Sequence, residues 1–337
     1  MILVTGATGI LGRVIVLELL KRGKTVRAAK RKSSNLEEVK NSFGFYTETP
    51  NEYFDSIEWI EVDFEDIHSL QNALNGVEEV YHCAAKVSFH PKDEKKMYQT
   101  NIEGTKQLLF ACQNSSVKKF LFVSSIAVLD GLNENGELDE SSDFNPKIDH
   151  SAYAISKHFS EMEVWRASAE GLNTVIVNPG LIIGSGNWKE SSGTLFMEFE
   201  KNDYTFSGGT SYVDVRDVAQ ISIELMEKNI FGERFILISE NKKYEEIANF
   251  IKQKLGKSAT KIVPNGLLKV GVFLNAILGW LISPLKMANK VNVQSVTEFN
   301  KISNMKIKEK LNYEFITVEE SLAFHLENYK KDKNFNK

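Results

Sequence analysis

The stretch TGATGILG, residues 5–12, decides the fold. It follows a short apolar run at 2–4 and leads into an apolar-periodic helical segment at 11–22. Strand, glycine turn and helix in this order are typical of a dinucleotide-binding turn. The first glycine permits a tight turn, the second lets backbone approach a diphosphate, and the third lets the helix pack on the strand. The helix N-terminus would hold the diphosphate charge. We expect ligand contacts from Gly6, Thr8, Gly9, Ile10, Leu11 and Gly12.

Outward from this turn, short apolar runs alternate with helical patterns over most of the first 180 residues. Nearly continuous apolar runs suit strands that are buried on both faces of a parallel sheet. Their alternation with helices predicts an α/β fold with a doubly wound, mostly parallel Rossmann sheet. The expected strands are 2–4, 25–29, 57–62, 79–83, 119–124 and 174–178, and the expected helices are 11–22, 66–74, 97–114 and 153–170.

The regular alternation of strands and helices ends after residue 180. We predict a dinucleotide-binding domain over 1–180, to which 211–239 returns because RFILIS at 234–239 is strand-like. A smaller C-terminal substrate-binding lobe would then comprise 181–210 and 240–330. Three stretches are expected to be connections or loops, namely 41–56, 184–193 and 207–211.

Composition limits the classes of function. The chain has 337 residues, 42% of them hydrophobic, and a formal net charge of −4, which favours a globular protein with a small-molecule partner over a nucleic-acid-binding protein. The histidines lack metal-ligand spacing, so we expect no metal site. The sequence opens directly with strand-like residues and no signal-peptide pattern, which favours a cytoplasmic protein. The sequence leaves the oligomeric state open, and a homodimer is one alternative.

One segment, 266–285, is apolar over twenty residues. Lys269, Asn275 and three glycines within it argue against a membrane span. We predict a buried or pocket-covering helix, with contact to a membrane surface as the alternative.

The end of the second strand bears on the choice of nicotinamide cofactor. An NAD site usually has an acidic residue there, which accepts hydrogen bonds from the ribose hydroxyls. Residues 26–32, VRAAKRK, contain no acid. Cations suit the 2′-phosphate of NADP(H), so we predict NADP(H), contacted by Lys30 and Arg31, with NAD(H) as the alternative. A solvated basic loop would explain the same residues without a ligand.

The next two strand ends also carry candidate cofactor contacts. Asp63 follows the third strand and could accept from an adenine amino group, or it could simply cap a helix. Small residues after the fourth strand would let a nucleotide lie against backbone at the carboxyl edge of the sheet. The candidates from these two strand ends are Asp63, Phe64, Ala84, Ala85 and Lys86.

The strongest catalytic signal is YAISK at 153–157 on a predicted helix. The i, i+4 spacing places Tyr153 and Lys157 on one helix face, and a nearby ammonium favours the phenolate. A tyrosine with a lowered pKa is useful for proton transfer. The fifth strand ends in Ser124 and Ser125, which brings a hydroxyl to the same edge of the sheet.

Together these motifs resemble the extended short-chain dehydrogenase/reductase family, also described as the NAD-dependent epimerase/dehydratase family. TGATGILG, VDF, HCAAK, NIEGT, VSS, YAISK, NPG and YVDVRDVA occur in that family's order. The resemblance implies Tyr153 as general acid/base and Lys157 as the residue that holds the nicotinamide ribose. It implies Ser125 as the hydrogen-bond donor to the substrate oxygen, with Ser124 as the alternative. The residues implied beside the cofactor also include Ser124, Tyr153, Lys157, Pro179, Leu181 and Ile182.

Within the family, the chain looks most like the dihydroflavonol-reductase and 3β-hydroxysteroid-dehydrogenase-like branch. Residues 126–128, IAV, replace the acidic pair of the sugar dehydratases. This resemblance implies an NADP(H)-dependent oxidoreductase that interconverts a ketone or aldehyde and an alcohol on a small, fairly apolar substrate. Two alternatives remain: a nucleotide-sugar epimerase that uses bound NAD, and a nucleotide-binding regulator without turnover.

Overall fold

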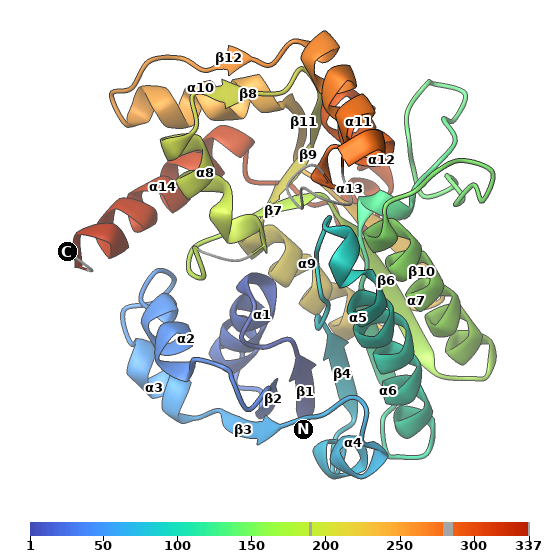
Figure 1. Ribbon diagram of the computed structural model, residues 1–337. Coiled ribbons are helices and arrows are strands. Elements are labelled where there is room, and N and C mark those ends of the chain that lie inside the picture. Colours follow the sequence, from blue (N-terminus) through green and yellow to red (C-terminus); the bar gives the residue numbers. More distant parts are fainter. Residues whose placement is uncertain (189–190, 279–285, 336–337) are drawn as a thin grey trace.

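The computed structural model describes residues 1–188, 191–278 and 286–335. Its centre is a seven-stranded sheet in which every neighbouring pair of strands is parallel (Figure 1). The predicted doubly wound Rossmann sheet is therefore confirmed. In spatial order the strands are β10 (Glu233–Leu237), β6 (Asn173–Pro179), β5 (Lys119–Val123), β4 (Glu79–His82), β1 (Ile2–Thr5), β2 (Val26–Lys30) and β3 (Glu58–Glu61).

Helices cover both faces of this sheet and enclose two apolar clusters. The helices of the first face, which pack around α1 and β1, are α1 (Ile10–Lys21), α2 (Leu36–Phe43), α3 (Pro50–Asp55) and α9 (Val215–Glu227). Those of the second face are α4 (Ile67–Ala73), α6 (Gly104–Gln113) and α7 (Ala152–Ala169). Burial on both faces explains why the central strands are nearly all apolar.

Two small sheets and several helices occupy the C-terminal part of the chain. The three-stranded sheet has the order β11 (Glu240–Lys243), β9 (Gly209–Asp214) and β7 (Leu181–Ile183), and β12 (Lys261–Ile262) pairs with β8 (Tyr204–Thr205). A third apolar cluster joins α8 (Leu195–Lys201), α10 (Tyr244–Lys254) and α14 (Val318–Phe335). Residues 211–239 thus contribute to both larger sheets, and the division into two domains stays a prediction.

Three local expectations were wrong. Residues 41–56 contain the end of α2 and all of α3, because Asn35 caps α2 by accepting from Glu38 N at 3.2 Å and Pro50 opens α3. The loop expected at 207–211 contains the start of β9, which pairs with β11. The single helix expected at 97–114 is instead α5 (Glu94–Tyr98), a π-helical turn (Gln99–Glu103) and α6.

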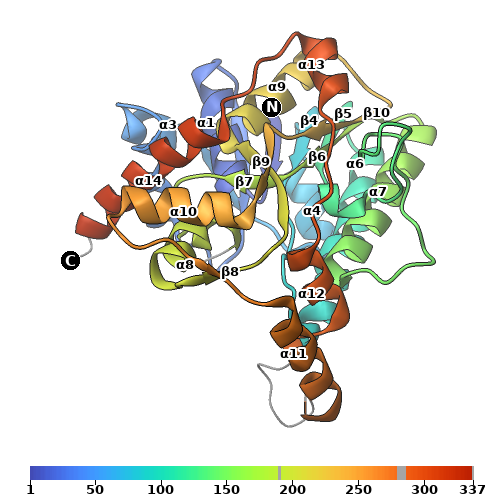
Figure 2. The same cartoon turned by 90° about the horizontal axis from the view of Figure 1, so that it is seen from above.

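The apolar segment 266–285 also differs from expectation. Its described part lies in α11 (Asn265–Leu278), and residues 279–285 lie outside the described residues. Leu267 is 62% exposed and Phe273 is 64% exposed, so this part is neither buried nor folded over the core. Seen from above, α11 projects from the body together with α12 (Lys290–Thr297) (Figure 2). Among the described residues, no helix is long and apolar enough to cross a bilayer.

Candidate active site

The glycine turn lies where β1 meets α1, against the end of β4. Gly6 has a φ of 65°, and a Cβ at this position would lie 2.6 Å from Ala84 N. A Cβ on Gly12 would collide with the Gly6 carbonyl. Gly9 is the N-cap residue of α1, and no side chain within the described ranges caps this helix. The turn is therefore a cradle with free amides at a helix N-terminus, which fits a diphosphate.

Arg13, which was not predicted from the sequence, stabilises this turn through hydrogen bonds to its backbone. Its side chain is fully buried and donates to the carbonyl oxygens of Thr8 and Gly9. The guanidinium also pairs with both carboxylate oxygens of Glu38 on α2. Glu38 in turn accepts from Asn187 N at 2.7 Å, so the pair links three segments of the chain. A cation directly after the third glycine is the only sequence signal for this role.

The basic residues in β2 and directly after it divide into two groups. Arg27 points to the amino end of the sheet, where it binds Glu58 at 2.8 Å and the carbonyl oxygens of Ala73 and Asn75. Lys30 and Arg31 lie at the carboxyl end instead. Lys30 Nζ is 3.9 Å from a carboxylate oxygen of Glu61 on β3. Arg31 is exposed, and its guanidinium has no partner among the residues that the structure describes.

Asp63 and Phe64 follow β3 at the same edge. The exposed carboxylate of Asp63 accepts from Glu65 N at 2.9 Å, as in a loop-stabilising turn. The Phe64 ring is half-buried, with its centroid 5.7 Å from that of His82. Asp63 thus has a structural role in this loop, and its other carboxylate oxygen remains the candidate acceptor for a ligand.

The segment after β4 is fixed by buried hydrogen bonds. His82 contacts Thr5 Oγ1 at 2.6 Å and Thr105 Oγ1 at 3.0 Å, and burial lowers the pKa of its imidazole to about 3. Ala84 N donates to the same Thr5 hydroxyl at 3.3 Å, so Ala84 and the following Ala85 lie directly beside the glycine turn.

Asn101, in the π-helical turn, connects this segment to the helix of the tyrosine. Its amide oxygen accepts from Lys86 N at 2.8 Å, and its amide nitrogen donates to Lys86 O and to Ser156 Oγ on α7. The Lys86 ammonium itself lies 3.3 Å from Asp93. The π-helical turn therefore sets the distance between the strand edge and the first turn of α7.

The first turns of α7 carry Tyr153 and Lys157. Ser151 caps this helix by accepting from Ala154 N at 3.1 Å. Lys157 is buried, its ammonium donates to Val123 O at 2.7 Å, and burial lowers its pKa to about 8. Burial raises the pKa of Tyr153, and a hydrogen bond with the Ser125 side chain opposes that increase. The lowering of the tyrosine pKa that the sequence predicted is therefore not observed, because the ammonium of Lys157 is directed at Val123.

The two serines after β5 have different surroundings. Ser125 is half-buried, its hydroxyl accepts from Ala127 N at 3.2 Å, and it lies close enough to the Tyr153 phenol to lower the pKa of that phenol. Ser124 is 3% exposed and lies beside the carboxyl group of Glu161. Asn178 on β6 donates to both Ser125 O (3.1 Å) and Glu161 (2.7 Å), which fixes the backbone of this pair. The geometry thus places only Ser125 next to the phenol.

Three predicted residues lie at the end of β6 and in β7. Pro179 is buried at the last position of β6, whereas Leu181 and Ile182 on β7 are half-exposed. They lie where the large sheet passes into the small one. The predicted site residues therefore all lie at or just beyond the carboxyl edge of the parallel strands, from the loop after β3 to β7.

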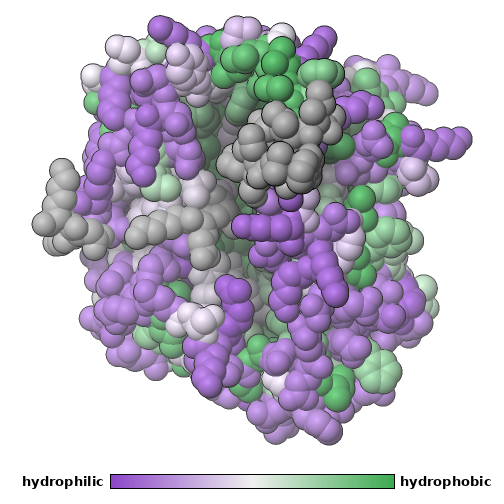
Figure 3. Space-filling model, in the orientation of Figure 1, coloured by the Kyte–Doolittle hydropathy of each residue, from purple (hydrophilic) through white to green (hydrophobic). Residues whose placement is uncertain are grey.

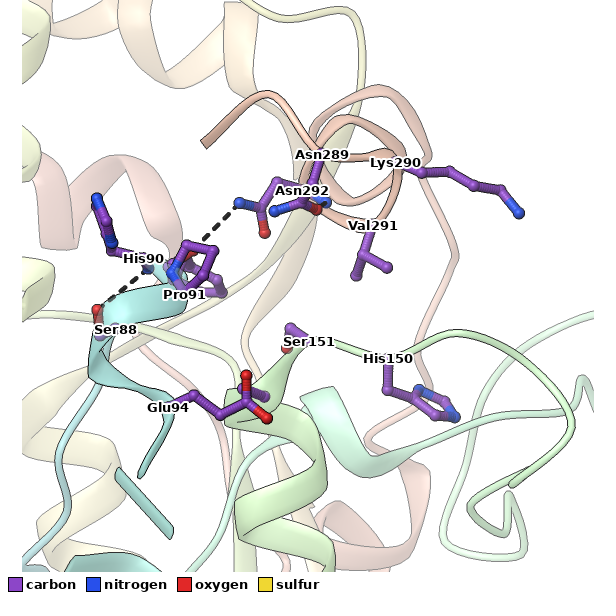
Figure 4. A pocket seen from close by; sticks show the side chains of 12 residues that line it. Ser88, His90, Pro91, Glu94, His150, Ser151, Asn289, Lys290, Val291 and Asn292 are labelled. Carbon is purple, nitrogen blue, oxygen red and sulfur yellow. Dashed lines mark hydrogen bonds between the residues drawn. The ribbon is translucent and has the colours of Figure 1, made fainter. Parts of the chain in front are cut away.

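A cavity of about 320 Å³ lies at the start of α7, where Ser151 and Ala152 line it (Figure 4). The Phe89 ring, one of its walls, lies 6.2 Å from the Tyr153 ring between centroids. The lining combines polar side chains with a larger apolar surface. The described part of α11 does not contribute to it, so the lid expected from 266–285 is not formed by that part. The lining residues are Ser88, Phe89, His90, Pro91, Glu94, His150, Ser151, Ala152, Asn289, Lys290, Val291 and Asn292. Within the described ranges, no group of three or more metal-ligating side chains is found.

Comparisons with known proteins agree with this geometry. Residues 2–237 match the sequence model of the NAD dependent epimerase/dehydratase family. Sterol demethylase protein B of Methylococcus capsulatus is 29% identical over 275 residues, which cover 81% of this chain and 80% of that protein. A putative dihydroflavonol 4-reductase of Synechocystis is 29% identical over 265 residues, which cover 77% of this chain and 73% of that protein.

Solved structures show the same fold. A UDP-glucose 4-epimerase from Thermotoga maritima superimposes with a TM-score of 0.76 at 22% identity, covering 98% of this chain and 99% of that one. Vestitone reductase from alfalfa superimposes with a TM-score of 0.71 at 19% identity, covering 98% of each chain. At these identities the likeness establishes the architecture alone.

Proposed function

Since this chain belongs to the NAD dependent epimerase/dehydratase family, we propose that it is an NADP(H)-dependent oxidoreductase that interconverts a ketone or aldehyde and an alcohol. The observation that carries the proposal is the arrangement of α7 against the end of β5. Tyr153 and Lys157 lie one turn apart on α7, and Lys157 donates to Val123 O at 2.7 Å, at the end of the strand that Ser125 follows. The relatives named dihydroflavonol 4-reductase support a reductase.

The cofactor fits the residues at the strand edge. The cradle at Gly6, Gly9 and Gly12 would hold the diphosphate, and Lys30 and Arg31 would bind the 2′-phosphate, because no acidic residue occurs in 26–32. Lys157 would hold the nicotinamide ribose. When bound, the nicotinamide supplies or accepts the hydride.

Tyr153 would act as the proton donor in the direction of reduction. Because burial raises its pKa, the phenol is protonated at neutral pH and can donate to the oxygen of a carbonyl substrate. Ser125 would donate a second hydrogen bond to the same oxygen and stabilise the developing negative charge. In the direction of oxidation the phenolate is required. The Lys157 ammonium, which here donates to Val123 O, would have to turn toward the phenol to stabilise that charge.

The nucleotide-sugar epimerase remains the second candidate because of one observation. The cavity near Tyr153 has His150, Glu94 and Lys290 in its lining, and these side chains could bind polar groups of a substrate. Such an enzyme would use bound NAD, for which the end of β2 lacks the expected acid.

Calorimetric titration of the purified protein with NADPH and NADH separates the two candidates. We expect NADPH to bind at least about tenfold more tightly, a difference of about 1.4 kcal/mol. The Tyr153→Phe variant should then lose carbonyl reduction while its NADPH affinity changes by no more than a few-fold. A preference for NADH, or protein purified with bound NAD, would favour the epimerase instead.

A further inference from the structure

The projecting helix α11 presents an apolar stripe to solvent. Leu267, Val270, Phe273 and Leu274 are 62%, 51%, 64% and 38% exposed, and their spacing places them on one side of the helix. Figure 3 shows hydrophobic side chains gathered over this part of the molecule, at the top of the view. At the edge of this stripe, a Cβ on Gly271 would lie 3.5 Å from the Cβ of Ala288, which precedes α12, and α11 also packs on α12 itself. The stripe therefore faces away from the protein, and exposed apolar stripes of this kind mark interaction surfaces.

The segment of sequence that contains this stripe carries charges of one sign. From residue 247 to residue 297 the sequence contains seven lysines and no aspartate or glutamate. Three of these lysines, Lys252, Lys257 and Lys290, pair with carboxylates of other segments. Lys261 on β12 and Lys269 on α11 are exposed. The rest of the chain holds 34 of the 41 Lys and Arg residues and all 45 Asp and Glu residues. The segment 247–297 is thus cationic, whereas the rest of the chain carries a net negative charge.

We propose that α11 docks on the surface of a lipid bilayer that contains anionic lipids. Its apolar stripe would enter the boundary between headgroups and acyl chains, while the lysines contact the headgroup phosphates. Repulsion between the anionic body and the same surface would fix the orientation of the protein, with α11 toward the bilayer. A second copy of the chain fits the stripe less well, because two such helices face to face would bring their lysines together.

This docking would also place the candidate active site near lipid. The first turn of α12, with Asn289 and Lys290, lines the cavity near Tyr153 and packs against α11. A substrate dissolved in the bilayer would therefore reach the cavity along the same pair of helices.

Vesicle co-sedimentation tests the proposal with the full-length chain. We expect the protein to sediment with vesicles of phosphatidylcholine containing roughly a quarter phosphatidylglycerol, and less with phosphatidylcholine alone. The double variant Leu267→Gln, Phe273→Gln should bind the anionic vesicles at least about tenfold more weakly. Lys269→Glu should weaken binding roughly fivefold or more, and high salt should weaken it for every variant.

The matched control is Phe110→Gln, which replaces an exposed aromatic ring (56% exposed) on α6, far from α11 in the fold. It should bind vesicles like the unaltered protein, and NADPH titration of each variant checks that the fold is intact. Failure of the unaltered protein to sediment with anionic vesicles, or equal binding by the double variant, would overturn the proposal. Concentration-dependent self-association that the double variant abolishes, without vesicle binding, would show instead that α11 is an interface between copies.

Discussion

The guanidinium of Arg13 contacts both carboxylate oxygens of Glu38, at 2.7 and 2.8 Å. The arginine side chain is fully buried, whereas the glutamate side chain is 35% exposed. The same guanidinium donates to carbonyl oxygens of the glycine turn, and the same carboxylate accepts a hydrogen bond from Asn187 N. One ion pair therefore joins the cradle on α1, the helix α2 and the segment after β7.

Removing the carboxylate should destabilise the protein and loosen the turn. Glu38→Ala leaves a buried cation without its partner, and we expect a loss of about 2–4 kcal/mol in the free energy of unfolding. Urea denaturation measures it. Glu37→Ala, an exposed neighbour on the same helix, should change the free energy by less than about 0.5 kcal/mol. Equal stability of the two variants would show that the Arg13 pair contributes little.

Cofactor selection should depend on Arg31. Arg31→Ala removes an exposed guanidinium at the carboxyl end of β2, and we expect NADPH affinity to fall roughly 10- to 100-fold, because a charge-assisted bond to phosphate is lost. NADH affinity should change by less than about threefold. Calorimetric titration of both cofactors measures the two changes separately. A parallel loss of both affinities would mean that Arg31 shapes the loop and does not bind the 2′-phosphate.

The sequence predicted the sheet and the glycine turn because their signals are local. The central strands are buried on both faces, so each has an apolar run of its own, and Gly6 is required by a conformation within its own turn. The α3 helix was missed because its six residues contain no buried side chain and so lack an apolar period. Its start was nevertheless marked by Pro50.

Features that depend on distant partners could not be predicted. Arg13 acts through Glu38 and, beyond it, Asn187, which lies 149 residues from Glu38 in the sequence. The apolar character of α11 was visible in the sequence. Whether such a helix is buried depends on whether another part of the protein covers its apolar side, and no described residue covers that side of α11. The choice between Ser124 and Ser125 was also open. The two residues are adjacent, and which hydroxyl faces the helix that carries Tyr153 depends on where β5 ends.

The two serines give different predictions for activity. Ser125→Ala removes the hydroxyl beside the Tyr153 phenol, and we expect kcat to fall roughly 100-fold with a small change in stability. The Ser124 hydroxyl is buried and has no hydrogen-bond partner among the described residues, so Ser124→Ala should change stability by less than about 0.5 kcal/mol and leave kcat within about threefold. Steady-state kinetics and urea denaturation on both variants separate the roles. If Ser124→Ala shows the larger loss of kcat, the roles of the two serines must be exchanged.

The buried carboxyl group of Asp217 should make stability depend on pH. It accepts from Tyr313 Oη at 2.9 Å and from Ile316 N at 3.0 Å, and burial raises its pKa to about 7. In the unfolded chain its pKa is about 3.9, so between these values the folded state binds the extra proton. This contribution favours the folded state at low pH and is lost as the pH rises toward 7.

Asp217→Asn removes the titration, so the variant should gain stability relative to the unaltered protein as the pH rises. Between pH 5 and pH 8 we expect a relative gain of roughly 1–3 kcal/mol in the free energy of unfolding. Urea denaturation at several pH values measures it, and the difference between proteins cancels the other titrating groups. Glu319→Gln, an exposed carboxylate on α14, should show a constant difference over the same range. A constant difference for Asp217→Asn as well would mean that this carboxyl group is ionised throughout, held by Tyr313 and the Ile316 amide.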